Sequence, residues 1–190
     1  MKCKHISSSR IFTFQKCEFA YWLGYHRHPT LDQVTVPLVM GRLVHSVLEN
    51  VGKHKGEDLK TQFDTAWKTE LNQLDAEERA TIEETDDATY KNITYAAIQR
   101  HGLRFFDIGR KDIRREVNFK LTLPNGTPIS GIIDVVHFLP NDIVEILDWK
   151  SSKTKPKFEE LDENVQLRFY DLAASLLYPG KDIVTTIDFL

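Results

Sequence analysis

The segment GIIDVVHFLPNDIVEILDWK, from Gly131 to Lys150, decides the fold. It contains two apolar runs separated by Pro140-Asn141-Asp142, and such turn-forming residues between apolar runs indicate two strands joined by a hairpin turn. A second hairpin is predicted just upstream, where Asn125-Gly126 divides an alternating stretch that begins near Ile113. The sequence therefore predicts a sheet over residues 110–150.

Polar residues stand at one end of the Gly131–Lys150 strand pair. In a strand, alternate side chains share a face, so Asp148 and Lys150 lie on one face and Trp149 on the other. Asp134 lies on the preceding strand, which lets two carboxylates and a lysine converge. A pair of carboxylates holds a hard divalent cation, and a neighbouring lysine orients water or neutralises charge on a phosphate.

Four short motifs occur in a fixed order along the chain. Together they resemble the signature of the PD-(D/E)XK nuclease superfamily, and in particular its RecB-like branch, which includes the AddB and CRISPR adaptation nucleases. The resemblance spans roughly residues 7–190. The motifs are Gly41-x-x-x-His45, Gly131-x-x-Asp134, Asp148-x-Lys150 and Gln166-x-x-x-Tyr170.

This resemblance implies an α/β fold with a restriction-endonuclease-like core, in which helices flank a central mixed sheet. It implies a metal-dependent deoxyribonuclease, an exonuclease of DNA recombination, repair or phage DNA processing, that uses Mg²⁺ or Mn²⁺. Asp134, Asp148 and Lys150 would be catalytic. The ligands would be His45, Asp134, Asp148 and the main-chain carbonyl of Trp149, and the imidazole favours Mn²⁺ more than carboxylates alone would.

The substrate contacts are predicted partly from the resemblance and partly from charge. Gln166 and Tyr170 would position the strand being cut, and Ser7 belongs to an N-terminal motif similar to that of RecB-like nucleases. Lys153 and Lys155 follow Lys150 in a loop, where they would contact nucleic-acid phosphates. Glu116 is either an additional acidic residue of the metal site or a surface glutamate, and the sequence leaves both interpretations open.

Length, net charge and hydropathy limit the classes of protein to which the chain can belong. The 190 residues have the length of one domain, so we expect a single nuclease domain over 1–190 with a helical insertion over 57–109. The net charge of −3 gives no global basic signature, which does not exclude DNA as the partner because metal-binding carboxylates count as negative. No apolar run is long enough to cross a bilayer, so we expect cytoplasmic localisation, or host cytoplasm for a phage protein, with no membrane partner.

Rival interpretations remain. A catalytically inactive nucleic-acid-binding module of the same fold is the main alternative, and a chance Asp-x-Lys in another metal hydrolase is a second. The chain holds no helicase motif, so a helicase or recombination protein enters only as a separate partner. An iron–sulfur cluster needs four thiolates in such proteins, and only Cys17 stands at a family ligand position. Either the protein lacks the cluster or the chain stops before the remaining ligands, and for the chain as given we expect no cluster and a buried Cys17.

The remaining elements follow from periodicity and capping. We expect a helix capped by one of Ser7, Ser8 or Ser9, with the aromatic residues of the N-terminal segment packed in the core. An amphipathic helix is predicted from near Val39, and the acidic stretch 75–87 is interpreted as a solvated face and loop. A helix over 161–178 and a last strand over 183–190 complete the prediction.

Overall fold

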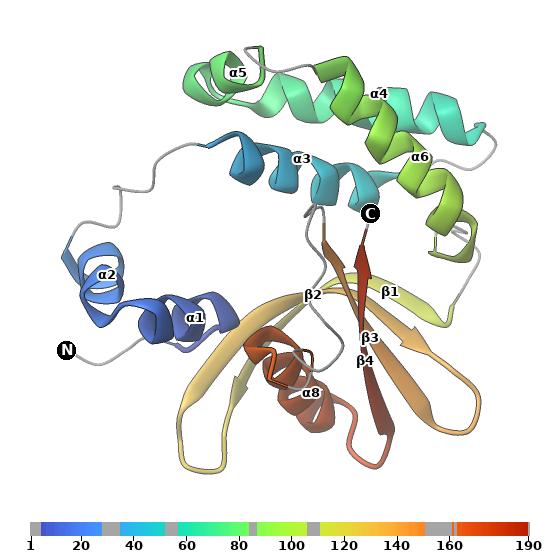
Figure 1. Ribbon diagram of the computed structural model, residues 1–190. Helices are drawn as coiled ribbons and strands as arrows, with labels where there is room; N and C mark the ends of the chain where they lie inside the picture. Colours follow the sequence, from blue (N-terminus) through green and yellow to red (C-terminus); the bar gives the residue numbers. More distant parts are fainter. Residues whose placement is uncertain are drawn as a thin grey trace. The chain divides into compact units, whose positions relative to one another are not determined.

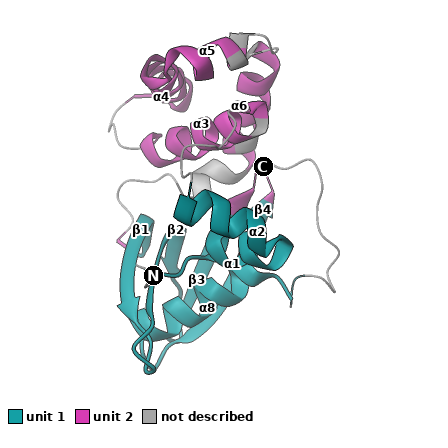
Figure 2. Ribbon diagram, turned by 90° about the vertical axis from the view of Figure 1, so that its left-hand side faces the viewer, with its two compact units in different colours: residues 1–32, 112–148, 154–188 teal, residues 33–111, 149–153, 189–190 magenta. Residues whose placement is uncertain are grey.

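The computed structural model describes residues 5–27, 35–51, 57–83, 87–105, 111–150, 161 and 163–189 (Figure 1). Its contacts divide the chain into two compact units (Figure 2). Unit 1 comprises residues 1–32, 112–148 and 154–188, and unit 2 comprises 33–111, 149–153 and 189–190. The helices within the predicted insertion 57–109 thus belong to the same unit as the helix over residues 36–50. The single-domain organisation stays a prediction.

Unit 1 is built on a mixed sheet of four strands in the order β1-β2-β3-β4. The first three pair antiparallel, whereas β4 starts beside the start of β3, with the Asp182 N–H bonded to the Asp142 carbonyl, and runs in the same direction (Figure 1). The predicted mixed sheet is confirmed. The strands are β1 (Ile113–Thr122), β2 (Pro128–Phe138), β3 (Ile143–Lys150) and β4 (Asp182–Phe189).

Both predicted hairpin turns form. Asn141 and Asp142 adopt φ values of 62° and 61° in the three-residue loop between Leu139 and Ile143, and Asn and Asp tolerate this left-handed backbone better than most residues do. The Leu123 N–H bonds to the Thr127 carbonyl across the first turn, and Gly126 lies there at a φ of 82°, which only glycine adopts without strain. Turn chemistry therefore fixes the register of β1, β2 and β3.

Gly131 admits a close approach across the sheet. It pairs with Phe119 on β1, and a Cβ at residue 131 would lie 2.7 Å from the Phe119 ring. Any larger side chain would displace this ring, which belongs to the main apolar core of unit 1. The glycine of the Gly-x-x-Asp motif thus has a packing role of its own.

The core of unit 1 lies between the sheet and α8 (Val165–Leu177). Its buried sheet residues are Phe119, Ile129, Ile133, Val136, Val144 and Ile146, and α8 contributes Phe169, Tyr170, Ala173 and Ala174. The small residues of α8 allow the helix backbone to lie close to the strands. Asn164 caps α8, so this helix starts later than the predicted residue 161.

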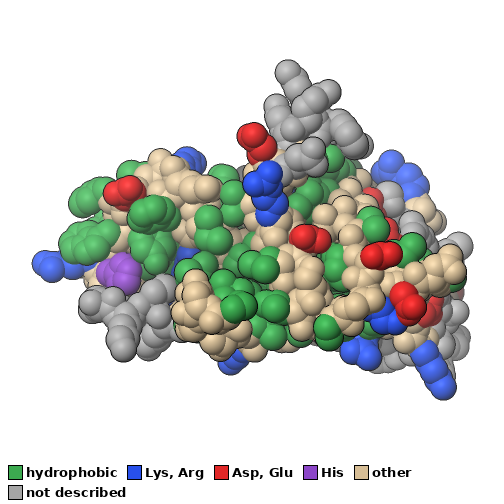
Figure 3. Space-filling view, turned by 90° about the horizontal axis from the view of Figure 1, so that it is seen from below, with side chains coloured by type: hydrophobic (Ala, Val, Ile, Leu, Met, Phe, Trp, Pro, Cys, Tyr) green, Lys and Arg blue, Asp and Glu red, His purple; other side chains and the backbone are tan. Residues whose placement is uncertain are grey.

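The N-terminal helices of unit 1 contribute no buried residue to this core, which corrects one prediction. Ser7 caps α1 (Ser8–Lys16) as expected, and α2 (Glu18–Trp22) continues into a π-helical turn, η1 (Leu23–Arg27). Their aromatic residues were expected in the core, yet Phe12, Phe19 and Trp22 expose 61%, 67% and 45% of their surface. Hydrophobic side chains accordingly gather on the left of the space-filling view, on the side of α1 and α2 (Figure 3).

Unit 2 is helical and contains α3 (Val36–Asn50), α4 (Leu59–Gln73), α5 (Ala76–Glu83) and α6 (Asp87–Phe105). Helix α3 packs against the other three, and its predicted apolar face is buried. The helix starts three residues earlier than Val39, with a proline in its first turn, where the missing N–H is not needed. The core residues include Val39, Leu43, Val47, Leu48, Val51, Phe63, Trp67 and Ile98.

The acidic stretch 75–87 is not merely a solvated face and loop. Part of it forms α5, where Glu78 is buried and pairs with Arg42 of α3. The pair attaches α5 to α3 by a charge interaction, which periodicity does not reveal. Within the described residues, no helix combines the length and hydropathy needed to cross a bilayer.

Candidate functional site

Three carboxylates lie in one row across the sheet of unit 1. The residues flanking Glu116 on β1 pair with the residues flanking Asp134 on β2, which sets these two acids opposite each other. On the other side of β2, Val135 pairs with Leu147, and one further step along both strands sets Asp134 opposite Asp148. The hydrogen-bond register therefore gives an acid of each of three strands a neighbouring position in the sheet.

Glu116 has an unusual backbone in this row. Its φ of 47° lies in the left-handed region, inside a strand, where a side chain with a Cβ costs about 1–2 kcal/mol. The residue is half-buried, and one of its carboxylate oxygens lies within 4.8 Å of a carboxylate oxygen of Asp134. Of the two interpretations open from the sequence, this geometry favours the acidic residue of a metal site over a surface glutamate.

Asp134 and Asp148 are buried, exposing 7% and 2% of their surface. Like charges directly opposite each other on neighbouring strands repel, and burial strengthens the repulsion because less water screens them. A divalent cation would offset this repulsion, and carboxylate oxygens are the ligands that Mg²⁺ and Mn²⁺ prefer. The three acids thus fit the cation that the sequence implied.

Helix α8 directs two polar side chains at this row. The Gln166 side-chain amide donates to Asp148 Oδ1 at 2.8 Å and to the Tyr170 hydroxyl at 3.0 Å. Asn164 holds the first turn of α8 by accepting from the backbone N–H groups of Gln166 and Leu167. The Gln-x-x-x-Tyr pair therefore lies on the face of α8 that meets the carboxylate row.

The negative charges of all three acids affect the pKa of the Tyr170 hydroxyl. Burial raises the pKa of its hydroxyl well above its ordinary value, and the negative charges of Asp148, Asp134 and Glu116 raise it further, while the hydrogen bond from Gln166 acts in the opposite direction. Tyr170 therefore keeps its proton at neutral pH. Its hydroxyl is therefore a neutral hydrogen-bonding group beside three carboxylates.

His45 and the end of β3 are described within unit 2. His45 lies on α3 one turn after Gly41, and its ring meets the Trp149 ring edge-on with centroids 6.4 Å apart. Trp149 is buried and directly follows Asp148 along β3. The strand continues through Lys150, so alternation puts Lys150 on the same face as Asp148. His45 and the Trp149 carbonyl stay predicted ligands.

The remaining residues singled out in the sequence are Ser7, Lys153, Lys155 and Cys17. Ser7 caps α1 through its hydroxyl, which accepts from the Arg10 N–H, and its role toward DNA stays a prediction. Lys153 and Lys155 lie outside the described residues. Cys17 was expected to be buried and is exposed, because it caps α2, its sulfur accepting from the Ala20 N–H.

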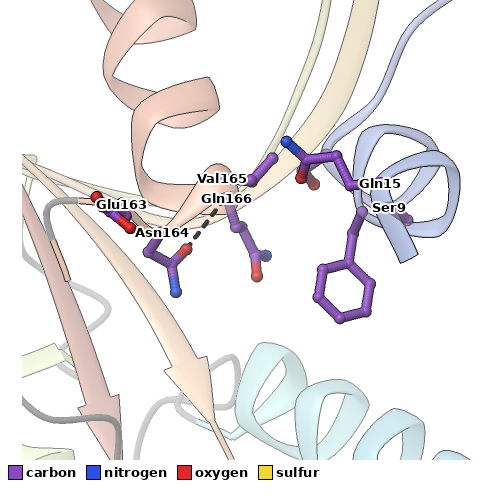
Figure 4. Close-up of a pocket in the computed structure, with 8 residues that line it drawn as sticks. Ser9, Gln15, Glu163, Asn164, Val165 and Gln166 are labelled. Atoms are coloured by element: carbon purple, nitrogen blue, oxygen red, sulfur yellow. Dashed lines mark hydrogen bonds between the residues drawn. The ribbon is translucent and has the colours of Figure 1, made fainter. Parts of the chain in front are cut away.

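Sequence reasoning missed a pocket of about 490 Å³ beside Gln166. In Figure 4, the Gln166 side chain extends from the start of α8 into the space that faces Ser9 and Gln15 of α1. A signal was present, because Ser8, Phe12 and Gln15 recur at helical spacing and give α1 a polar face with one aromatic ring. The pocket is lined by Ser8, Ser9, Phe12, Gln15, Glu163, Asn164, Val165 and Gln166.

Comparison with known protein families identifies a superfamily for this chain. The family model of the PD-(D/E)XK nuclease superfamily matches residues 5–187, which is nearly the whole chain and includes all four motifs. No curated protein matches the chain. The match covers the carboxylate row, α8 and α3 together.

Proposed function

This chain belongs to the PD-(D/E)XK nuclease superfamily, and on that premise we propose that it is a metal-dependent deoxyribonuclease that hydrolyses phosphodiester bonds. The observation that carries the proposal is the approach of the Glu116 and Asp134 carboxylates to within 4.8 Å, with Asp148 one register step beyond the last β2–β3 pair. Like charges opposite each other on neighbouring strands repel, and a bound divalent cation would offset that repulsion, so a metal-binding function accounts for the position of these acids.

We assign the cation to Asp134 and Asp148, with Glu116 as a further acidic group and His45 and the Trp149 carbonyl as additional ligands. The contact of His45 with Trp149, the residue after Asp148, supports its inclusion. Mg²⁺ or Mn²⁺ bound there supplies Lewis-acid activation of the phosphate and of the attacking water.

The other residues act on the substrate and on the ligands. The cationic Lys150 orients the attacking water and stabilises the negative charge that develops on the phosphate in the transition state. Gln166 holds Asp148 in one orientation through the hydrogen bond at Oδ1. Tyr170, neutral and fixed by Gln166, offers a hydroxyl to a strand whose phosphates the acids would otherwise repel.

The finer assignments rest on the resemblance to the RecB-like branch. We propose that the enzyme is an exonuclease, acting on DNA ends in recombination, repair or phage DNA processing. A helicase or recombination protein that supplies those ends and a cytoplasmic site of action are further expectations. The cleavage pattern on closed DNA tests the exonuclease assignment directly.

The test is a cleavage assay with the wild type and Lys150→Ala. End-labelled linear single- and double-stranded DNA and a closed circle are incubated with Mg²⁺, Mn²⁺ or chelator. We expect metal-dependent cleavage of linear DNA, an intact circle, and a loss of about 100-fold to 1,000-fold in the variant. The matched control is Lys181→Ala, which removes a lysine paired with Asp142 in the hairpin turn and should leave cleavage unchanged.

The outcomes separate the alternatives. Cleavage of the circle would replace the exonuclease assignment with an endonuclease. Cleavage that survives in Lys150→Ala would remove the catalytic role of this lysine. DNA binding without cleavage under any metal condition would establish the inactive binding module instead.

A further inference from the structure

The chain carries an exposed aromatic surface outside the carboxylate row, formed by Phe12, Phe19 and Trp22. The Phe19 and Trp22 rings are stacked, with centroids 6.1 Å apart and planes inclined by 24°. Neither α1 nor α2 has a buried residue, so these rings do not hold the core together. A cluster of exposed aromatic side chains of this kind marks an interaction surface.

The charge around the aromatic surface suits a polyanion. Over residues 8–27 the sequence carries three cationic residues, Arg10, Lys16 and Arg27, against one acid, Glu18, although the whole chain has a net charge of −3. The Arg27 guanidinium lies 5.8 Å from the centre of the Trp22 ring. A base stacked on this surface would therefore have cationic groups nearby to neutralise its phosphates.

One residue of the aromatic surface also borders the candidate site. Phe12 lines the pocket that also contains Gln166, and Gln166 donates to Asp148 in the carboxylate row. All of these residues belong to unit 1. A single DNA strand lying along α1 would thus pass from the exposed aromatic rings, through the pocket with its amide and hydroxyl groups, to the carboxylate row.

We propose that Phe12, Phe19 and Trp22 form a stacking platform for unpaired bases of single-stranded DNA that enters the carboxylate row. The inference rests on the proposed function for the cleavage step after binding, but the binding itself is measured separately. Every base has a face that stacks on an aromatic ring, whereas a duplex hides those faces. The platform therefore selects single strands without selecting a sequence.

The experiment measures binding of an oligodeoxythymidine of about 15 nucleotides, a length within the range one domain contacts, in chelator so that no cleavage occurs. The double variant Phe19→Ala/Trp22→Ala should bind about tenfold more weakly or worse. Its loss should be absent with an abasic strand of the same length and with a duplex. The matched control is Leu172→Ala, which removes an exposed apolar side chain of α8 and should bind like the wild type.

Two further readouts do not depend on folding of the double variant. Of the three tryptophans, Trp67 and Trp149 are buried, so quenching of tryptophan fluorescence by the oligonucleotide should come from Trp22 and disappear in Trp22→Phe. Trp22→Phe should keep most of the affinity because phenylalanine also stacks. Arg27→Gln should lower the salt dependence of binding, which the aromatic variants should leave unchanged.

Unchanged oligonucleotide binding in the double variant would overturn the inference and assign the aromatic surface to contact with a protein. An equal loss on the abasic strand would overturn it too, because stacking needs bases. Failure of the proposed function has a different signature, since the wild type would bind the single strand with base-dependent affinity yet never cleave it with Mg²⁺ or Mn²⁺.

Discussion

Two polar pairs on β2 and β3 lie three residues apart and are built differently. His137 pairs with Glu145 in the strand register, and its Nδ1 lies 3.0 Å from Glu145 Oε2, while Asp112 approaches Nε2 at 3.5 Å. At the other pair, Asp134 faces Asp148, and Glu116 continues the row of acids. Both pairs are buried, so the same strands hold one acid–base pair and one acid–acid pair.

The difference separates groups that serve folding from groups that serve chemistry. A histidine between carboxylates satisfies buried polar atoms by itself, and Thr186 donates to the remaining Glu145 oxygen. Like charges in a row of acids repel one another, and a bound cation would offset this repulsion. The comparison predicts opposite effects on stability and activity for variants of the two pairs.

The largest effect is expected from Asp134→Asn. We expect metal-dependent cleavage to fall by roughly 100-fold to 1,000-fold, because the variant removes charge that holds the cation and the transition state. Stability of the metal-free protein should rise by about 0.5 kcal/mol, since a like charge has left the row. Urea unfolding in chelator, beside the cleavage assay, measures both, and a loss of stability equal to that of a core variant would contradict the comparison.

Glu145→Ala should have the opposite profile. Removing the acceptor of His137 leaves buried polar groups unsatisfied, so we expect the free energy of unfolding to fall by about 1–3 kcal/mol. Cleavage per folded molecule should stay at the wild-type level. Urea unfolding and the cleavage assay test this, and Glu145→Gln, which keeps a hydrogen-bonding side chain, should recover part of the stability.

Variants of Glu116 test whether the left-handed backbone at this position is required. Glu116→Val should destabilise by about 1–2 kcal/mol, because a β-branched residue suits the left-handed backbone poorly. Glu116→Asn removes the same charge but tolerates this backbone, so its stability should equal or exceed that of the wild type. Equal stability of the two variants would show that the left-handed conformation is not required at this position.

The smallest effect is expected in unit 2, at the exposed pair of Lys60 and Asp64 on α4. Hydrogen bonds from Lys60, then from Lys91, lower the pKa of the Asp64 carboxyl. Its stabilisation is therefore present above the ordinary aspartate pKa, about 4, and is lost as the pH falls below it. A double-mutant cycle of Lys60→Ala and Asp64→Ala should give no more than about 0.5 kcal/mol at pH 7, with cleavage unchanged.

Local sequence predicted much of unit 1. Turn residues at 125–126 and 140–142 fixed two hairpins, and the spacing of Asp134 and Asp148 about the second turn placed them opposite each other. Helical spacing likewise put Gln166 and Tyr170 on one face of α8. These predictions succeeded because hairpins and helix faces depend on contacts between residues close in sequence.

Predictions of which side chains are buried were less successful, because burial depends on contacts between residues far apart in the sequence. Aromatic residues of α1 and α2 were expected in the core because burial is their usual state, yet only tertiary packing decides which helices cover the sheet. The same holds for Cys17, whose capping of α2 leaves it exposed, and for Glu78, which pairs with Arg42 from a helix far away in sequence.

The sequence by itself determined the hairpins, the order of the four motifs and the family, since these depend on residue types at short spacings. The tertiary structure alone decided that Glu116 joins the acids, through a left-handed residue inside β1, and that Gln166 reaches Asp148 from α8. The backbone conformation of Glu116 and the packing of α8 on the sheet depend on contacts between residues far apart in sequence, which no local pattern encodes.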